Sequence, residues 1–445
     1  MCSGWEGERV LDNSVLALII LGIVLFLFIW DKIPIGLTAM LGAVAMALFG
    51  IMPLKDAFAG FGSDTVMLVA GMLTIGSAMY ETGFAAAIGE KVMHIKGVAS
   101  NERLFLAVIL VLVVMMSCFV SNTATVALFL PLVSSVAVSS GGKVTKKNTF
   151  MAIGAATILG GNLTLVASTP QLVVQGVLSA SGGETLGFFT LFAGAFPLVL
   201  VMLAYYMTIG YRMQNKFFTF EETVVNEQAG DHLQTGGISE PAPDRKQNKS
   251  KMLICACILA GCVAGFVTGF ASYGIIAIIG ASLCIITGCI SFTRASHLLD
   301  WSSIAVLGGS LGIAEGMNQS GALTMAAEGI LGLLGGPETS PWLMLAAIAV
   351  ITSLLSHVMS STATAAVMAP IAIAVAAGIG ARPLTFAIMV VLADSLNFST
   401  PIGTTPMTMT LTAGYRFKDY IVVGGVITLI TLAVCIITTP LIYGL

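Results

Sequence analysis

Charged residues are scarce in this sequence of 445 residues. Asp, Glu, Lys and Arg together make up 9% of the chain, whereas 57% of its residues are hydrophobic. A water-soluble protein needs many more charges to cover its surface, so the composition excludes a soluble globular protein. Apolar runs of about 18 or more residues, long enough to cross a bilayer as a helix, recur along the whole chain. We therefore predict an all-α polytopic membrane protein.

Three further absences exclude other classes of protein. The net charge is −3, so no basic surface points to nucleic acid as a partner. The eight cysteines show no metal-binding or redox spacing and are expected to be small packing residues. No His-Glu-x-x-His motif or paired Asp and His is present, so we expect no catalytic residues, and an intramembrane enzyme remains only an unlikely alternative. The acidic start of the chain lacks a basic segment, and no cleavable signal peptide is expected.

One long hydrophilic stretch interrupts the apolar pattern, at about 213–251. It mixes acidic and basic residues with Gly236-Gly237 and with Pro241 and Pro243, which disfavour a helix. We interpret it as a solvated linker between two transmembrane units, 1–212 and 252–445. Each unit carries one apolar segment with a polar motif at its centre, at about 104–141 and about 342–380. Both segments are long enough for two short helical arms joined at a polar tip, as a re-entrant hairpin or as two full crossings.

The remaining apolar segments predict ten crossings, five in each unit. The candidate crossings are about 14–30, 34–52, 65–80, 150–180, 188–211, 252–270, 273–291, 302–318, 383–411 and 419–443. An odd number of crossings in the first unit inserts the second unit with the opposite orientation. The pattern therefore predicts an inverted-topology repeat with two re-entrant hairpins and two broken helices, the architecture of many secondary transporters.

The distribution of basic residues predicts the orientation in the membrane. With the linker in the cytoplasm, sixteen of the 19 Lys and Arg residues fall on the cytoplasmic side, and only Arg9, Lys55 and Arg382 fall outside. Such a bias is typical of cytoplasmic loops. We therefore expect a multi-pass protein of the cell (inner) membrane with a cytoplasmic linker and both termini external.

The two units carry related polar motifs. Ser121-Asn122-Thr123-Ala124-Thr125 is matched 239 residues later by Ser360-Ser361-Thr362-Ala363-Thr364. In lipid, such hydroxyl and amide groups need partners, and two copies in matched positions favour a binding site over chance. If each motif is a hairpin tip, the second arm begins near Thr123 or Thr362. Its free N–H groups then favour an anion.

A second matched pair lies downstream. Val166-Ala167-Ser168-Thr169-Pro170 corresponds to Ile402-Gly403-Thr404-Thr405-Pro406, at a shift of 236 residues. Proline breaks a membrane helix and frees carbonyl groups. Carbonyls beside hydroxyls form the all-oxygen surroundings that hard cations prefer. A simple proline kink is the structural alternative for each segment.

These motifs resemble those of the divalent-anion:sodium symporter family, the dicarboxylate, citrate and sulfate carriers of the ion-transporter superfamily. The resemblance spans about 30–420, and Gly414-Tyr415-Arg416-Phe417 is similar to the sulfate-carrying members. It implies Na⁺ as the coupling ion, a small anionic substrate, the lipid bilayer as surroundings and a homodimer. By the same resemblance, the substrate-binding residues are Asn122, Thr123, Ser168, Ser361, Thr362 and Thr404. Sodium site 1 comprises Ser117, Ser121, Asn122 and the carbonyl of Ala167. Sodium site 2 comprises Ser356, Ser360, Ser361 and the carbonyl of Gly403.

The sequence departs from the family pattern at the second tip, where Ser361 replaces the usual asparagine. The shorter side chain is expected to widen the site or admit water. Three ionisable groups near the motifs also need a function. Asp394 is a candidate coupling residue, as a cation ligand or a proton carrier, while Glu315 and His357 are weaker candidates.

We expect a sodium-coupled symporter of a di- or trivalent anion, either a dicarboxylate, a citrate-like acid or sulfate, that works by alternating access. The alternatives are a proton-coupled carrier or exchanger of the same superfamily that uses Asp394, or a channel, which a broken-helix inverted repeat disfavours.

Overall fold

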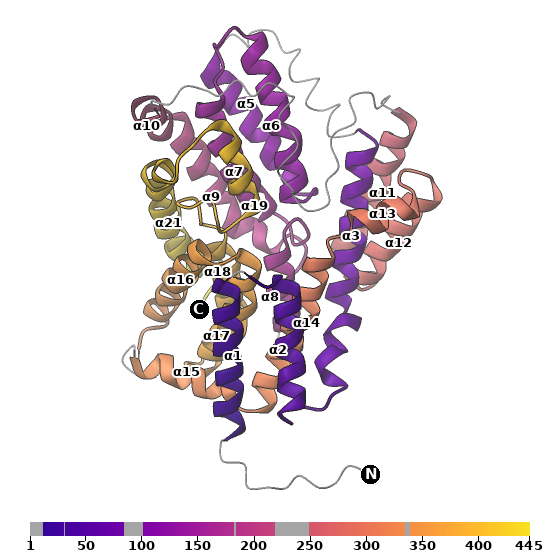
Figure 1. Cartoon of the computed structure of the whole chain (residues 1–445), viewed down its shortest axis with the longest axis vertical. Helices are drawn as coiled ribbons and strands as arrows, with labels where there is room; N and C mark the ends of the chain where they lie inside the picture. The colour runs from indigo at the N-terminus through magenta and orange to yellow at the C-terminus, as the bar shows by residue number, and fades with distance from the viewer. Residues whose placement is uncertain (1–11, 31, 84–100, 182–183, 219–248, 334–338) are drawn as a thin grey trace.

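The computed structural model of the chain is built of helices, as the composition predicts (Figure 1). It describes residues 12–30, 32–83, 101–181, 184–218, 249–333 and 339–445. No strand occurs within these ranges. The predicted linker at 213–251 lies mostly outside the described residues, as do Arg9, Lys91 and Lys96 of the charge pattern.

The described helices run through both halves of the chain. The first half contains α1 (Asn13–Trp30), α2 (Ile35–Leu48), the 3-10 helix η1 (Asp56–Gly62), α3 (Asp64–Glu81), α5 (Glu102–Ser117), α6 (Asn122–Ser139), α7 (Lys146–Gly161), α8 (Thr169–Ala180), α9 (Thr190–Met207) and α10 (Ile209–Phe217). The second contains α11 (Lys249–Thr268), α12 (Tyr273–Ile286), α13 (Phe292–Leu298), α14 (Trp301–Gln319), α15 (Ala322–Leu333), α16 (Pro341–Val358), α17 (Ser361–Gly378), α18 (Pro383–Asp394), α19 (Thr405–Met409), the 3-10 helix η3 (Thr410–Ala413), α20 (Phe417–Asp419), the π-helical turn η4 (Tyr420–Gly424) and α21 (Gly425–Tyr443).

Several helices are suited to a lipid bilayer. Six described helices are long and apolar enough to cross a membrane, or seven if the bent pair η1 and α3 is one span. Shorter apolar helices, α12 among them, add to these. On α12, Ile275, Ile279 and Ile286 are 55%, 50% and 79% exposed. Their spacing places them on one helix face, which lipid would cover. The number of crossings beyond these helices stays a prediction.

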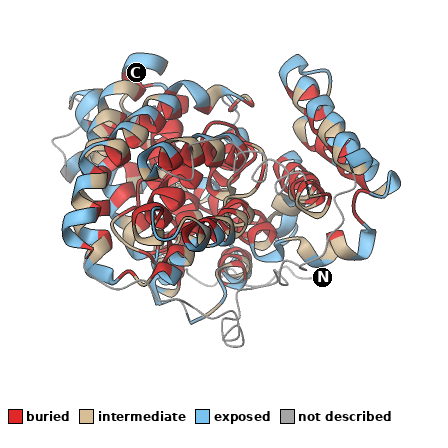
Figure 2. Cartoon of the chain, turned by 90° about the horizontal axis from the view of Figure 1, so that it is seen from above, coloured by how far each residue is buried: buried red, intermediate tan, exposed pale blue. Residues whose placement is uncertain are grey.

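Buried residues gather in the larger of two groups of helices (Figure 2). The smaller group consists of α3 and α11 to α13, on the right of Figure 1. Within it α3 packs along α12 and also contacts α11 and α13. Arg294 of α13 forms an ion pair with Glu81 of α3 at 3.0 Å. The larger group contains the two polar motifs, so the candidate site lies in the better-buried part of the molecule.

The predicted two-armed segments each form a pair of helices joined by a short turn that ends in a serine. The helices α5 and α6 are separated by residues 118–121, and α16 and α17 by residues 359–360. The predicted breaks in the following segments are confirmed as well. Residues 162–168 separate α7 from α8, and residues 395–404 separate α18 from α19. Both halves therefore repeat the same order of elements, while their opposite insertion in a membrane stays a prediction.

Helix α10 extends into the predicted linker, at residues 213–217, and two further α-helices, α13 and α15, were not predicted from the sequence. The first of these two has seven residues, too few to show a clear hydrophobic period. The second runs across the neighbouring helices in Figure 1 and packs against α17.

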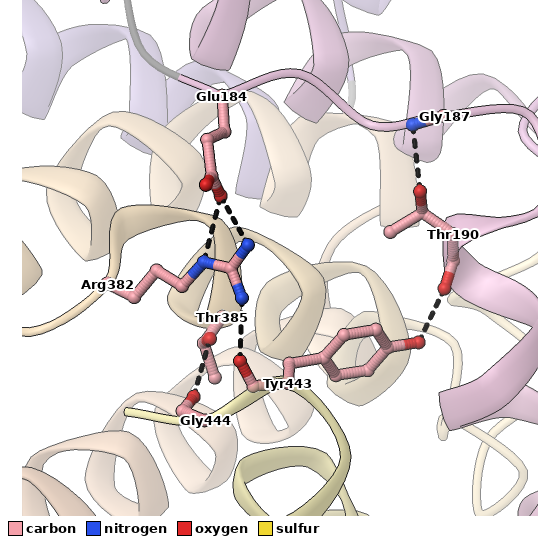
Figure 3. Close-up of polar contacts among 7 residues, drawn as sticks. All are labelled: Glu184, Gly187, Thr190, Arg382, Thr385, Tyr443 and Gly444. Atoms are coloured by element: carbon pink, nitrogen blue, oxygen red, sulfur yellow. Dashed lines mark hydrogen bonds and ion pairs between the residues drawn. The ribbon is translucent and has the colours of Figure 1, made fainter.

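The C-terminal end of the chain is tied to both halves (Figure 3). The guanidinium group of Arg382 pairs with Glu184 at 2.7 Å and donates to the Tyr443 carbonyl at 2.8 Å. The Tyr443 hydroxyl donates to the carbonyl of Thr190 at 2.5 Å and accepts from the backbone N–H of Gly194 at 2.9 Å. These contacts join the starts of α18 and α9 to the end of α21, on the side predicted to be external.

A second polar cluster holds together the end of the molecule predicted to be cytoplasmic. The Glu102 carboxylate accepts hydrogen bonds from the Thr145 backbone at 2.9 Å, from Asn148 at 3.1 Å and from Tyr211 at 2.6 Å. Segments carrying several of the predicted cytoplasmic Lys and Arg residues, at the starts of α5 and α7 and in α10, thereby share one end of the fold.

The orientation can be tested by labelling. A cysteine in place of Lys146 should resist a membrane-impermeant thiol reagent added to intact cells, because the charge bias places this segment inside. A cysteine at Arg382 should be labelled under the same conditions and serves as the control. Labelling of the first position in sealed cells would reverse the predicted topology.

Candidate functional site

The first polar tip is shaped by a serine cap. The Ser121 hydroxyl accepts a hydrogen bond from the backbone N–H of Ala124 at 3.4 Å, and α6 begins at the next residue, Asn122. Thr125 donates to the Ser121 carbonyl at 3.1 Å, so its hydroxyl is used within the helix. The first N–H groups of a helix have no partner inside it. At this tip they point toward the end where Asn122 and Thr123 lie.

The second tip has nearly the same geometry. Ser360 caps α17 by accepting from the N–H of Ala363 at 3.3 Å, and Thr364 donates to the Ser360 carbonyl at 3.2 Å. The caps adopt φ −56°, ψ 144° at Ser121 and φ −64°, ψ 145° at Ser360. The matched motifs therefore fold into matched helix starts.

The breaks in the two helices also match. Ser168 precedes α8 with φ −140° and ψ 139°, and Thr404 precedes α19 with φ −140° and ψ 141°. Each is followed by a threonine and a proline that begin the next helix. Proline is tolerated there because the missing N–H would be unsatisfied anyway. The proline segments thus restart a helix rather than merely kink one.

In the first half, the tip meets the end of α7. The Ser117 hydroxyl lies 2.8 Å from Asn122 Oδ1 and 2.7 Å from the carbonyl oxygen of Thr157. A Cβ added at Gly161 would lie 2.4 Å from Asn122 Oδ1, so a larger residue there would displace the amide. Ser117 is buried and Asn122 half-buried. This small oxygen-rich space includes Ser117 and Asn122 of predicted sodium site 1, with Ser121 capping the helix beside it.

Ala167, the remaining member of predicted site 1, is buried in the loop between α7 and α8. The other residues supply neutral hydroxyl and amide oxygens, the donor set that fits a hard monovalent cation. Coordination by the Ala167 carbonyl stays a prediction.

In the second half, the tip and the loop are joined directly. The backbone N–H of Ser361 donates to the carbonyl of Gly403 at 3.2 Å. A Cβ at Gly403 would lie 2.2 Å from the Ser356 carbonyl oxygen. Three residues of predicted sodium site 2 therefore come together, with Ser360 capping the helix beside them.

The site is not widened at Ser361, because another side chain fills the space left by the shorter residue. Asn397 Nδ2 donates to the Ser361 hydroxyl at 3.0 Å and lies 3.3 Å from the Ser356 carbonyl oxygen. The room left by the shorter residue is therefore occupied by an amide from the loop after α18.

The predicted substrate-binding residues share an intermediate degree of exposure. Asn122, Thr123, Ser168, Thr362 and Thr404 are all half-buried, whereas Ser361 is buried. Exposure of this kind lets a solute reach polar groups that are otherwise surrounded by apolar residues. The Thr404 hydroxyl oxygen is itself buried without a hydrogen-bond partner in the described part of the chain. This hydroxyl group therefore keeps an unused hydrogen-bonding capacity.

Three ionisable groups near the motifs differ in their surroundings. His357 bonds through its ring nitrogens to the Ser353 carbonyl at 2.6 Å and the Ser399 hydroxyl at 3.1 Å, as a satisfied packing group would. Glu315 accepts from Gln319 at 2.6 Å. Asp394 is fully buried, and neither carboxyl oxygen has a hydrogen-bond partner among the residues described.

A polar link that was not predicted from the sequence joins the two broken helices. Asn162 Oδ1 accepts from Gln171 at 2.7 Å and from the Ser395 hydroxyl at 3.2 Å. Gln171 also donates to the Gly161 carbonyl at 2.9 Å. These amides sit inside apolar segments, which was the signal that could have identified them. They connect the loop of the first half to the end of α18.

A cavity of about 680 Å³ lies away from the tips, between α8, α14, α15 and α17. Its lining includes the carboxylates of Glu315 and Glu328. Like charges disfavour an anion there, so the tips and loops remain the better candidate for an anion site.

Helices that cross a membrane, together with polar tips that meet breaks in neighbouring helices, define a multi-pass helical membrane transporter. The sequence profile of the citrate transporter family, CitMHS, matches residues 25–393. The chain belongs to this family. The match agrees with the resemblance to the divalent-anion:sodium symporters.

Known transporters resemble the chain over most of its length. It is 25% identical to an uncharacterized transporter of Haemophilus influenzae, over 95% of this chain and 90% of that protein. It is 24% identical to the sodium-dependent high-affinity dicarboxylate transporter 3 of Caenorhabditis elegans, over 90% and 78% respectively. The fold is similar to the crystal structure of the YdaH transporter of Alcanivorax borkumensis, with a TM-score of 0.63 at 14% identity, over 97% and 98% of the two chains.

Proposed function

We propose that this transporter carries a small di- or trivalent anion, a dicarboxylate, a citrate-like acid or sulfate, together with sodium by alternating access. The observation that carries the proposal is the matched pair of tips and loops, joined in the second half by the Ser361 N–H to Gly403 carbonyl hydrogen bond of 3.2 Å. Two such units face a ligand with helix N-termini, hydroxyls and amides. Sodium coupling is supported by the neutral oxygen groups beside each tip and by the name of the dicarboxylate relative.

The anion would be bound without a basic side chain. No Lys or Arg belongs to either motif or either loop. Its charge would instead meet the N–H groups at the starts of α6 and α17, the hydroxyls of Ser168 and Thr404, and the bound cations. Each cation lowers the electrostatic cost of holding the anion in a low-dielectric site. Binding of the two solutes would therefore be coupled.

The resemblance also supports the quaternary and cellular parts of the proposal. We place the protein in the cell (inner) membrane as a homodimer, with a cytoplasmic linker and both termini external. The molecular mass of the detergent-solubilised protein tests the dimer. A molecular mass equal to that of a single chain in mild detergent would contradict the proposed dimer.

A proton-coupled carrier or exchanger is the second candidate. It is favoured by one observation, the fully buried Asp394 carboxyl group without a hydrogen-bond partner among the described residues. A carboxylate inside a membrane protein commonly serves ion or proton movement.

The proposal can be tested with the purified protein. Thermal unfolding should be shifted upward by the transported anion, and the shift should be larger in sodium than in choline, because a ligand stabilises the folded state that binds it. Succinate, citrate and sulfate are the first anions to compare. Equal shifts of the unfolding midpoint in both salts would contradict sodium coupling. The absence of a shift with any di- or trivalent anion would contradict the proposed substrate class.

Loss of one hydroxyl should separate binding from folding. Thr362→Val is nearly isosteric and removes only the hydroxyl at the second tip. The anion affinity should fall roughly 5- to 150-fold, the equivalent of about 1–3 kcal/mol. The midpoint of thermal unfolding should change little, since Thr362 is half-buried at the tip. Thr268→Val on α11, where the hydroxyl bonds its own helix at 2.9 Å, is the matched control and should leave affinity unchanged.

A further inference from the structure

The interior of the second broken helix contains an uncompensated acid. Asp394 is the last residue of α18, is 0% exposed, and has no hydrogen bond to either carboxyl oxygen within the described ranges. No ion pair found among those residues involves it. An isolated carboxylate in such a place is strongly unfavourable unless a positive charge accompanies it.

A second oxygen lies unused beside it. Asn397 is 0% exposed, and its Oδ1 has no partner in the part of the chain described here, while its Nδ2 is held by Ser361 at 3.0 Å. Asp394 stands three residues before Asn397, at the end of α18. Two buried oxygen groups, one of them acidic, thus lie three residues apart in the chain, and neither has a hydrogen-bond partner among the described residues.

Comparison of the two halves explains why an amide from the loop, that of Asn397, lies at the second tip. The shift of 236 residues that aligns the loops places Gly161 opposite Asn397. In the first half the tip supplies the amide, Asn122, and the opposite position is Gly161 at the end of α7, where a side chain would collide with that amide. In the second half the tip supplies only Ser361, and the loop supplies the amide. The same chemical group is thus retained at each tip but comes from the other segment.

We propose that the Asp394 carboxylate and Asn397 Oδ1 bind the second coupling cation, with Ser361 holding the Asn397 amide in place. The proposal deepens the proposed function and rests on its sodium coupling. Carboxylate and amide oxygens are suitable ligands for a hard monovalent cation. A cation in this site is neutralised by the protein, so it binds before any anion is present. The site beside Asn122 has no acidic group, and its cation depends on the anion.

Sodium binding can be measured without transport. The midpoint of thermal unfolding is followed as sodium chloride replaces choline chloride at constant ionic strength, with no transported anion. The wild-type protein should be stabilised in a saturable manner. Asp394→Asn should raise the sodium concentration for half of this effect about tenfold or more. Glu315→Gln, a change at a carboxylate outside the site, should leave it unaltered.

Two results would overturn the proposal. One is a wild-type protein that sodium alone does not stabilise, as expected if the Asp394 carboxyl group is simply neutral. The other is Asp394→Asn with a lower unfolding temperature but an unchanged sodium response, which indicates a structural role alone.

The exchanged amide provides a second test that does not need the Asp394 variant to fold. Asn397→Gly should weaken the sodium response. Adding Ser361→Asn, which recreates the arrangement of the first half, should restore it in part. A double variant no better than Asn397→Gly would count against the amide as a ligand.

Failure of this proposal is distinguishable from failure of the proposed function. If stabilisation by sodium requires Asp394 but the protein transports no di- or trivalent anion, the cation site is supported and the proposed transport function is wrong. If the protein takes up the anion under a sodium gradient but Asp394→Asn leaves the sodium affinity unchanged, the transport function is supported and the cation site is wrong.

Discussion

Asn122→Ala should raise the anion concentration for half-maximal uptake roughly 5- to 150-fold, because losing one buried hydrogen bond costs on the order of 1–3 kcal/mol. The amide stands at the first tip, half-buried, with its Oδ1 2.8 Å from Ser117 Oγ. The proposal assigns it to both the substrate and the first cation. Its removal should therefore also weaken the dependence of uptake on sodium.

Folding should tolerate this change. The Ser117 hydroxyl keeps the Thr157 carbonyl as an acceptor at 2.7 Å, so no buried donor is left without a partner. Asn101→Ala is the matched control, because Asn101 also stands at a helix start but only caps α5, accepting from Arg103 N–H at 3.1 Å. The control should lose some stability and keep its affinity. Uptake with normal apparent affinity in Asn122→Ala would refute the assignment of the first tip.

Gly403→Ala should reduce sodium-stimulated uptake by at least about tenfold and lower stability by about 1–3 kcal/mol, as overpacking of a filled interior does. The added Cβ would lie 2.2 Å from the Ser356 carbonyl oxygen and 2.5 Å from Asn397 Nδ2. The Ser356 carbonyl oxygen belongs to the backbone and cannot rotate away, so the tip and the loop must move apart. The Ser361 N–H to Gly403 carbonyl bond would be lost with them.

Gly62→Ala is the control for this change, since nothing lies within 4 Å of a Cβ added there. Uptake by reconstituted protein and the midpoint of thermal unfolding should be measured for both variants. If Gly403→Ala transports like the control, the close contact between tip and loop has no part in function.

The tips and breaks could be predicted because their signals are local. A Ser-x-x-x-Thr stretch forms its cap and its back-bond within one turn, as Ser121 and Thr125 do. A proline two residues into a helix marks its start, as Pro170 does for α8. Such features depend on residues that are close in the sequence, so they form independently of contacts with distant parts of the chain. The family resemblance then supplied roles for the same positions.

The contacts between segments could not be read from the sequence. Asn397 reaches Ser361 across 36 residues, and Asn162 reaches Ser395 across 233. A buried amide in an apolar run signals a need for partners without naming them. For this reason, the sequence at the second tip predicted a wider site, whereas the structure places a loop amide there. The short helix α13 was missed because seven residues carry too little periodicity.

Uptake of succinate, citrate or sulfate into proteoliposomes, under sodium and proton gradients imposed separately, distinguishes sodium coupling from proton coupling. We expect concentrative uptake of one of these anions under an inward sodium gradient and none under a proton gradient without sodium. Concentrative uptake driven by protons in the absence of sodium would contradict it. Asp394→Asn, if it then abolished concentrative uptake while sparing exchange, would identify Asp394 as the proton carrier instead.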